Sequence, residues 1–269
     1  MNAQDKLARL TRILKKMERV LIGFSGGVDS TFLSRVAQKT LGNKALAVTV
    51  VTDFLPRSEK KDAVRIAKKL NLHREVALVR IPRRCLNNPV DRCYYCKKKI
   101  FSELTRIAKK KNIAWVLDGS NSDDLNEFRP GEKALKELGV RSPLQEAGMN
   151  KKDIRRFARE TGIDIWDKPA YTCLATRIPF GQLITAVTLA MVEKAEEDLR
   201  RAGFLQSRVR HHQEIARIEV SKKDIPRLIR SASLIAGKLK KIGFCRVTVD
   251  LEGYRRGPLQ EEGVWKRKK

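Results

Sequence analysis

The chain has 269 residues, of which 42% are hydrophobic and 33% charged, and its formal net charge is +27. This length and composition allow one large folded domain or two smaller ones and show no low-complexity segment. No apolar run approaches the roughly 18 residues that a membrane span needs. The first 20 residues are amphipathic and lack the apolar core of a secretory signal. We therefore expect a cytoplasmic protein that does not enter a membrane.

The net charge indicates which partners to expect, and the cysteine content indicates how the thiols are used. The chain carries 58 Lys and Arg against 31 Asp and Glu, a balance that favours nucleotides, nucleic acid or phosphorylated substrates. A Lys-rich surface of a thermophilic or generally basic proteome would give the same balance, so both explanations stay open. The five cysteines are unevenly spread, which argues against a disulfide framework. If the thiols act, we expect them to act as ligands or nucleophiles.

Strands and helices alternate through the first part of the chain. The apolar runs predict strands at 20–24, 44–52, 73–82 and 113–120. Helical periodicity predicts helices within 1–20, 30–41, 58–72 and 97–111. This order is typical of an α/β fold with a doubly wound parallel sheet, here expected to cover about residues 18–170.

The pattern changes after PFGQ at 179–182. A helix at 188–204, strands at 206–212 and 215–221, a helix at 224–243 and a last strand at 244–254 are predicted there. This α-β-β-α-β order indicates a smaller α+β domain with an antiparallel sheet. We therefore expect domains at 1–180 and 181–257, followed by a basic tail at 258–269.

The stretch FSGGVDST lies between the first strand and its helix. Glycines let the backbone approach phosphate oxygens, and a helix N-terminus offers unpaired N–H groups and a partial positive charge. Neither the Walker A pattern nor GxGxxG is present. The residues alone therefore leave two interpretations open, a phosphate-binding loop and a structural turn.

Two further segments follow predicted strands. Residues 49–53 end the second strand, and Gly119, Ser120, Asn121 and Asp124 follow the fourth. Because ligands of open α/β sheets bind at the carboxyl ends of the strands, these segments are expected to border the same ligand. A plain capped turn would also explain GSNSDD.

Three cysteines lie in unusual surroundings. Cys93 and Cys96 form the single CxxC of the chain, in RCYYCK, and Cys173 lies in the loop WDKPAYTCLATRIPFG. The neighbouring Arg177 would favour the thiolate of Cys173. An iron–sulfur cluster, a zinc site and a redox disulfide remain open for these thiols. The other two cysteines are expected to be bystanders, namely Cys85 and Cys245.

The first predicted strand of the second domain contains RVRHH. Strand alternation puts Arg208 and Arg210 on one face, and Glu219 of IARIE faces the same hairpin. Two guanidinium groups are suited to a phosphate and a carboxylate. An ordinary charged surface strand is the alternative, and His211 and His212 are expected to be structural.

The motif SGGxDS after the first strand resembles the pyrophosphate-binding loop of the PP-loop ATP pyrophosphatases. With RCYYCK, DGSNSDD, KPAYTCLATRIPFG, RVRHH, IARIE and LEGYRRG in this order, the chain is similar to the LarE-type sulfur transferases, which make the nickel-pincer cofactor of lactate racemase. The resemblance implies that ATP and Mg²⁺ are used to adenylate a carboxylate of pyridinium-3,5-biscarboxylic acid mononucleotide. Pyrophosphate leaves, and sulfur then replaces oxygen.

The same resemblance implies roles for individual residues. The implied ATP-binding residues are Ser25, Gly26, Gly27, Asp29, Ser30, Thr49, Gly119 and Asn121, with Asp29 near Mg²⁺. The implied substrate-binding residues are Arg177, Arg208, Arg210 and Glu219. Cys173 matches the catalytic, sulfur-bearing cysteine of the family.

The family resemblance also suggests a use for the CxxC pair. The best-known form of the family sacrifices its single cysteine as the sulfur donor and has no CxxC. A variant uses three cysteines to hold a [4Fe-4S] cluster with one open iron, and we predict this variant, with Cys93, Cys96 and Cys173 as ligands. An external sulfide donor and a homo-oligomer are implied. Related PP-loop enzymes thiolate tRNA, so RNA binding stays open, as does a regulatory protein whose cysteines sense iron or oxygen.

Overall fold

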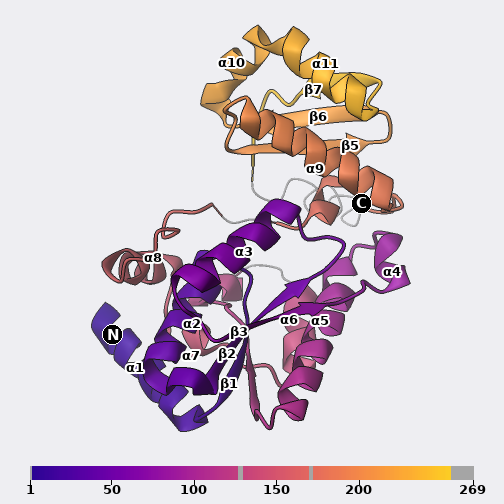
Figure 1. Ribbon diagram of the computed structural model, residues 1–269. Coiled ribbons are helices and arrows are strands. Elements are labelled where there is room, and N and C mark those ends of the chain that lie inside the picture. Colours follow the sequence, from indigo (N-terminus) through magenta and orange to yellow (C-terminus); the bar gives the residue numbers. More distant parts are fainter. Residues whose placement is uncertain (1, 127–129, 170–171, 256–269) are drawn as a thin grey trace. The chain divides into compact units, whose positions relative to one another are not determined.

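A computed structural model describes residues 2–126, 130–169 and 172–255, and the chain divides into two compact units (Figure 1). The first unit comprises Met1–Pro82 and Cys93–Tyr171, and the second comprises Arg83–Arg92 and Thr172–Lys269. The short segment 83–92 therefore belongs with the C-terminal part of the chain. The expected domain boundaries at 180 and 257 stay predictions, and the basic tail at 258–269 lies outside the described residues.

The first unit is built on a four-stranded parallel sheet. Its strands are β1 (Val20–Gly23), β2 (Ala45–Val51), β3 (Arg74–Leu78) and β4 (Trp115–Leu117), in the order β3-β2-β1-β4. The chain adds β2 and β3 on one side of β1 and β4 on the other. The strand order therefore reverses between β1 and β4, which is where open sheets of this kind bind ligands. The predicted parallel α/β fold is confirmed.

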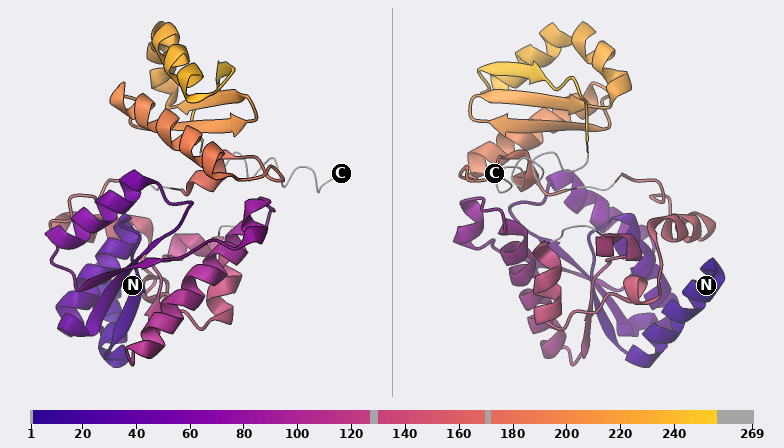
Figure 2. Two further views of the ribbon diagram at one scale, coloured as in Figure 1. Left: turned by 45° about the vertical axis from the view of Figure 1, so that its right-hand side comes forward. Right: turned by 180° about the vertical axis from the view of Figure 1, so that it is seen from behind.

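Helices cover both faces of this sheet (Figures 1 and 2). Their bounds are α1 Ala3–Met17, α2 Val28–Leu41, α3 Arg57–Lys69, α5 Arg92–Lys110, α6 Pro130–Glu137, α7 Pro143–Glu146 and α8 Lys151–Glu160, with short 3₁₀ helices η1 Gly42–Lys44 and η2 Ser122–Asn126. Strand alternation divides β1 between the two layers, because successive side chains point to opposite faces. Val20 and Ile22 join the core with α1, α2 and α8, whereas Leu21 joins the core with α5 and α6.

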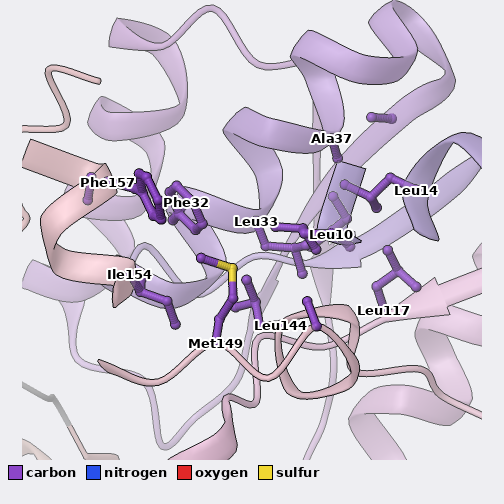
Figure 3. Close-up of a cluster of buried hydrophobic side chains, with 14 of the residues drawn as sticks. Leu10, Leu14, Phe32, Leu33, Ala37, Leu117, Leu144, Met149, Ile154 and Phe157 are labelled. Atoms are coloured by element: carbon purple, nitrogen blue, oxygen red, sulfur yellow. The ribbon is translucent and has the colours of Figure 1, made fainter. Parts of the chain in front are cut away.

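The core on the α1/α2/α8 side contains an aromatic pair (Figure 3). The rings of Phe32 in α2 and Phe157 in α8 are stacked, with centroids 6.2 Å apart. Leu33, Met149 and Ile154 pack around them in the same cluster. This packing fixes α8 against α2, and so fixes the start of α8 close to the start of α2.

The second unit combines helices with a three-stranded mixed sheet. It contains α4 Arg83–Leu86, η3 Leu174–Arg177, α9 Ala186–Arg201, β5 Ser207–His212, β6 Ile215–Val220, η4 Lys222–Asp224, α10 Ile225–Arg230, α11 Ala232–Ile242 and β7 Arg246–Val249. The apolar side chains of α9, α10 and α11 share one core with Val209 and Ile218 of the sheet. The opposite face of the β5–β6 hairpin carries the charged side chains.

Two details of the second unit differ from the sequence prediction. β5 and β6 are antiparallel, but β7 pairs parallel to β6, so the expectation of a purely antiparallel sheet is wrong. The physical reason is the helical connection through α10 and α11, since a parallel pair needs a crossover of this length. The helix predicted at 224–243 is interrupted at Ser231, which separates α10 from α11.

Within the part of the chain that the structure describes, no helix is long and apolar enough to cross a membrane.

Replacing Phe32 by Ala should test the aromatic pair. The side chain is 1% exposed, so its removal leaves a cavity and should lower the free energy of unfolding by about 3–5 kcal/mol. Urea denaturation followed by far-UV circular dichroism measures this loss. Leu78→Ala is the control, because Leu78 is 78% exposed on β3 and its loss should cost less than about 0.5 kcal/mol. Equal costs in the two variants would contradict the packing described here.

Candidate active site

The turn after β1 is shaped by two serines. Ser30 Oγ accepts a hydrogen bond from the Ser25 N–H (3.2 Å) and donates one to the Gly27 carbonyl oxygen (3.2 Å). Ser25 Oγ accepts from the Gly27 N–H at 3.3 Å. Gly27 is the N-cap of α2 and offers no side-chain oxygen to its first turn. The N–H groups of that turn can therefore be offered to an anion, as at other helix N-termini.

Two glycines bring the segments of this site together. Gly26 has φ +74°, and a Cβ on it would lie 2.8 Å from Cα of Ala63 in α3. A Cβ on Gly119, just after β4, would lie 3.1 Å from the backbone N of Ser30. Side chains at these positions would force the segments apart. The turn after β1 and the loop after β4 thus meet where the strand order reverses.

A charged pair lies at the same place. Lys151 Nζ is 2.7 Å from Oδ1 and 2.6 Å from Oδ2 of Asp29, and Asn121 Nδ2 donates to Asp29 Oδ2 at 3.4 Å. A capping box between Asn150 and Asp153 starts α8 and so places Lys151. The site therefore presents a carboxylate and an ammonium side by side.

A buried carboxylate supports the loop after β4. Asp118 is 5% exposed and accepts hydrogen bonds from Ser120 Oγ and Ser142 Oγ, both at 2.6 Å. Lys97 of α5 adds an ion pair with Asp118 at 3.4 Å. The sequence reasoning named neither Asp118 nor Lys151. Asp118 had a local signal, since it lies near the carboxyl end of the strand predicted at 113–120. Lys151 had none, because it lies 122 positions from Asp29.

The structure places most of the predicted ATP-binding residues together. Thr49, 4% exposed, follows Val48, whose strand partner is Gly23 at the end of β1. It therefore lies at the same edge of the sheet as the turn. The residues that the turn, the loop after β4 and their contacts bring together are Ser25, Gly26, Gly27, Asp29, Ser30, Gly119 and Asn121.

Cys93 and Cys96 lie in the first two turns of α5, which begins at Arg92 and not at the predicted residue 97. Their spacing of three residues puts both thiols on one side of the helix, and both side chains are partly exposed. Tyr94 points elsewhere, donating to Glu137 Oε2 at 2.7 Å. Among the described residues, no three His, Cys, Asp or Glu side chains are gathered so as to hold a metal ion.

Cys173 is the N-cap of η3 in the second unit, and its side chain is partly exposed. Arg177, expected to bind substrate, is fully buried behind this loop. Its Nε and Nη2 donate to the two carboxylate oxygens of Glu196 (2.9 and 3.0 Å), and Nη1 donates to the Cys173 carbonyl oxygen (2.9 Å). Protein groups thus occupy all three of its nitrogens.

Segment 83–92 holds the other side of the same loop. Asn88 Nδ2 donates to the carbonyl oxygens of Ile178 (2.9 Å) and Pro179 (2.7 Å), and Arg92 Nη1 donates to that of Ala175 (3.1 Å). Asn88 and Arg92 are 0% and 3% exposed. Segment 83–92 therefore supports the Cys173 loop within the second unit.

The charged face of the β5–β6 hairpin contains the other predicted substrate residues. Arg210 forms a two-pronged ion pair with Glu219 (both contacts 2.8 Å) and donates to the Thr176 carbonyl oxygen at 2.8 Å. Arg208 lies over the ring of Tyr254, 5.1 Å from its centroid. Both arginines are at least nine-tenths buried.

His211 lies on the other side of β5, with its ring 5.6 Å from that of Phe244. Burial lowers the pKa of His211, which favours the neutral imidazole.

Known proteins resemble this chain in sequence. Residues 5–98 match the NAD synthase family model. A pyridinium-3,5-bisthiocarboxylic acid mononucleotide synthase of Lactiplantibacillus plantarum is 38% identical over 259 residues, which cover 95% of this chain and 94% of the relative. The chain belongs to the LarE-type family. The PP-loop resemblance is therefore confirmed, and with it the expected enzyme class, an ATP-using sulfurtransferase.

Two further relatives are similar over almost the whole chain. An uncharacterized protein of Synechocystis is 39% identical over 260 residues, covering 95% of this chain and 97% of its own length. A further uncharacterized protein, of Methanocaldococcus jannaschii, is 36% identical over 253 residues, with coverage of 93% and 97%.

The close approach at Gly26 yields a paired test. Gly26→Ala should reduce ATP-dependent pyrophosphate release at least ~10²-fold, because the added Cβ displaces the turn from α3 and misplaces the phosphates. Gly42→Ala is the control, since Gly42 also has positive φ (+61°) but has no atom within 4 Å of an added Cβ. Pyrophosphate release by the two purified variants, at equal folded concentration, measures the effect. Equal losses would show that backbone strain alone matters.

Proposed function

We propose that this enzyme activates a carboxylate of pyridinium-3,5-biscarboxylic acid mononucleotide with ATP and converts it to a thiocarboxylate. The name of the Lactiplantibacillus relative supports this substrate, since its product is the bisthiocarboxylic acid. Carboxylate oxygen is a poor leaving group, so its replacement by sulfur requires prior activation. The observation that carries the proposal is the Asp29–Lys151 pair beside the serine-shaped turn at the reversal of strand order.

The residues of the first unit suit the activation step. A substrate carboxylate oxygen attacks the α-phosphorus of ATP, and the bond to the departing pyrophosphate breaks. The turn at Ser25–Ser30 and the N-terminus of α2 would hold the phosphates through N–H and hydroxyl donors. The Asp29 carboxylate is a ligand of the kind that Mg²⁺ prefers. Lys151, 2.6 Å from Asp29, would contact a phosphate oxygen and balance the charge that develops on pyrophosphate.

Sulfur transfer completes the proposed reaction. A sulfide attacks the activated acyl carbon, and AMP leaves with the former carboxylate oxygen. Arg208, whose guanidinium lies over the ring of Tyr254, is proposed to bind an anionic group of the substrate.

Arg210 and Glu219 were assigned to the substrate from the sequence, but they form a buried pair that donates to the Thr176 carbonyl oxygen. We propose that this pair supports the Cys173 loop beside that carbonyl group. Arg177 was also assigned to the substrate from the sequence, but its burial points to another role, which is argued in the next subsection.

We also propose that Cys93, Cys96 and Cys173 hold a [4Fe-4S] cluster. Their donor chemistry fits, since all three are thiols with partly exposed side chains and two lie one helical turn apart on α5. When bound, such a cluster would supply the sulfide from an external donor, so the polypeptide would survive each reaction cycle.

The proposed roles of Asp29 and Lys151 can be tested by substitution. Lys152, the next residue of α8 after Lys151, serves as the control. Lys151→Met should raise the KM for ATP about 10–100-fold, the range expected for loss of a hydrogen bond to a charged group. Asp29→Asn should abolish pyrophosphate release, because the Mg²⁺ ligand is weakened. Lys152→Met, which removes an exposed lysine one position away, should leave both parameters unchanged.

The measurement is substrate-dependent release of pyrophosphate and AMP. Formation of ADP and phosphate would exclude adenylation. An equal effect of Lys152→Met would mean that general positive charge, and not the pairing with Asp29, determines ATP affinity.

The cysteine assignment predicts an iron content that depends on Cys173. After anaerobic reconstitution, the protein should contain iron and acid-labile sulfide, and Cys173→Ser should lose most of both. Cys245→Ser should keep them, because Cys245 is exposed and lies in none of the motifs. With added sulfide, the enzyme should form several equivalents of product at unchanged intact mass.

Three outcomes would contradict this assignment. Stoichiometric zinc, or unchanged iron in Cys173→Ser, would exclude the three-cysteine cluster. Dehydroalanine at position 173, formed in step with product, would make Cys173 a sacrificed sulfur donor. Separately, thiolated uridine formed in an ATP-dependent tRNA assay would contradict the proposed small-molecule substrate and replace it by RNA.

A further inference from the structure

We propose that Arg177 is a positioning residue, which fixes the backbone of Cys173, and that Glu196 orients Arg177 for this task. The inference rests on the proposed function in one respect, namely that Cys173 takes part in sulfur transfer. In this role, Arg177 holds the loop that carries Cys173 and does not contact the substrate.

Glu196 holds the guanidinium group in one orientation. Its two oxygens accept hydrogen bonds from Arg177 Nε (2.9 Å) and Nη2 (3.0 Å), and Oε1 also accepts from the Val209 N–H (3.1 Å). The backbone of β5 therefore helps to fix the Glu196 side chain, which lies on α9. A two-pronged contact of this kind restricts the plane of the guanidinium as well as its position.

The remaining nitrogen contacts the loop on both sides of Cys173. Arg177 Nη1 is within 2.9 Å of the Thr172 and Cys173 carbonyl oxygens and of the Thr172 and Thr176 hydroxyl oxygens. The Thr176 N–H donates to the same Cys173 carbonyl at 3.1 Å. These hydrogen bonds hold the backbone of Cys173 from the buried side of the loop, while its thiol stays partly exposed.

Burial separates this role from substrate binding. Arg177 is 0% exposed, and each of its nitrogens donates to a protein oxygen. A substrate anion would have to displace Glu196 or the loop carbonyls to reach it. Lysine cannot substitute, because one ammonium cannot serve the carboxylate and the loop with the geometry of a planar fork. Misplacing a reacting group by about 1 Å can cost ~10²-fold in rate.

The test uses two variants that differ in how they disturb the buried pair. Arg177→Lys keeps the charge and loses the fork. The double variant Arg177→Met/Glu196→Gln removes both charges, so neither is left buried without its partner. Glu197→Gln is the control, because it alters the neighbouring residue of α9, whose contact with Arg201 is exposed. Thermal unfolding establishes that each variant is folded.

Two readouts are compared. In both variants, kcat for thiocarboxylate formation should fall ~10²-fold at an unchanged KM for the substrate, as expected when a reacting group is displaced and not when binding is lost. Amide hydrogen exchange of Thr176 and Ile178, whose N–H groups bond within this loop, should become at least ~10-fold faster. Glu197→Gln should change neither.

Two results would contradict the inference. A raised KM at unchanged kcat would make Arg177 a substrate ligand. Unchanged exchange at Thr176 and Ile178 would show that other contacts suffice to hold the loop. The exchange measurement does not depend on activity. If the wild-type enzyme forms no thiocarboxylate, the proposed function fails, and the exchange readout still decides whether Arg177 and Glu196 order the loop.

Discussion

The close approach of two backbone segments is the constraint on which the nucleotide site depends. Gly119, after β4, lies against Ser30 in the first turn of α2, so closely that a Cβ at Gly119 would come within 3.1 Å of the Ser30 backbone N and push the two segments apart. This contact is possible because β4 lies next to β1, on the side away from β2. The phosphate-binding turn and the loop carrying Asn121 therefore meet at one edge of the sheet. Asp29 and Lys151 are close because α8 packs on α2.

A second constraint governs the cysteine loop. A short segment with little regular structure leaves many backbone carbonyl groups without a partner in a helix or strand. Those carbonyl groups that are buried need hydrogen-bond donors from elsewhere. Buried side chains from three parts of the unit provide them, namely Arg177 with Glu196, Arg210 with Glu219, and Asn88 with Arg92. Pairing with a carboxylate makes the burial of each of the first two guanidinium groups tolerable. The same contacts that satisfy the backbone also restrict where the thiol of Cys173 can lie.

These constraints have different functional consequences. In the first unit, the pair of Lys151 and Asp29 is partly exposed, with 32% and 21% of the side-chain surfaces accessible, so both can exchange partners when a ligand binds. In the second unit, the side chains of Arg177 and Glu196 are 0% and 4% exposed, so a ligand would have to displace protein groups to reach them. Partly exposed charges suit binding, whereas buried pairs suit positioning. The strongly basic composition of the chain therefore includes cations of both kinds.

The sequence by itself determined the features that depend on local patterns. The apolar runs located all four strands of the parallel sheet, and SGGVDS identified the turn after β1, because strand alternation and glycine spacing are properties of neighbouring residues. The direction of β7, the Asp29–Lys151 pair and the burial of Arg177 behind Cys173 were decided by the tertiary structure. Each depends on contacts between residues distant in sequence, or on which face of a loop packs inward. A charged side chain carries no local mark of whether its partner will be a ligand or another side chain of the same protein.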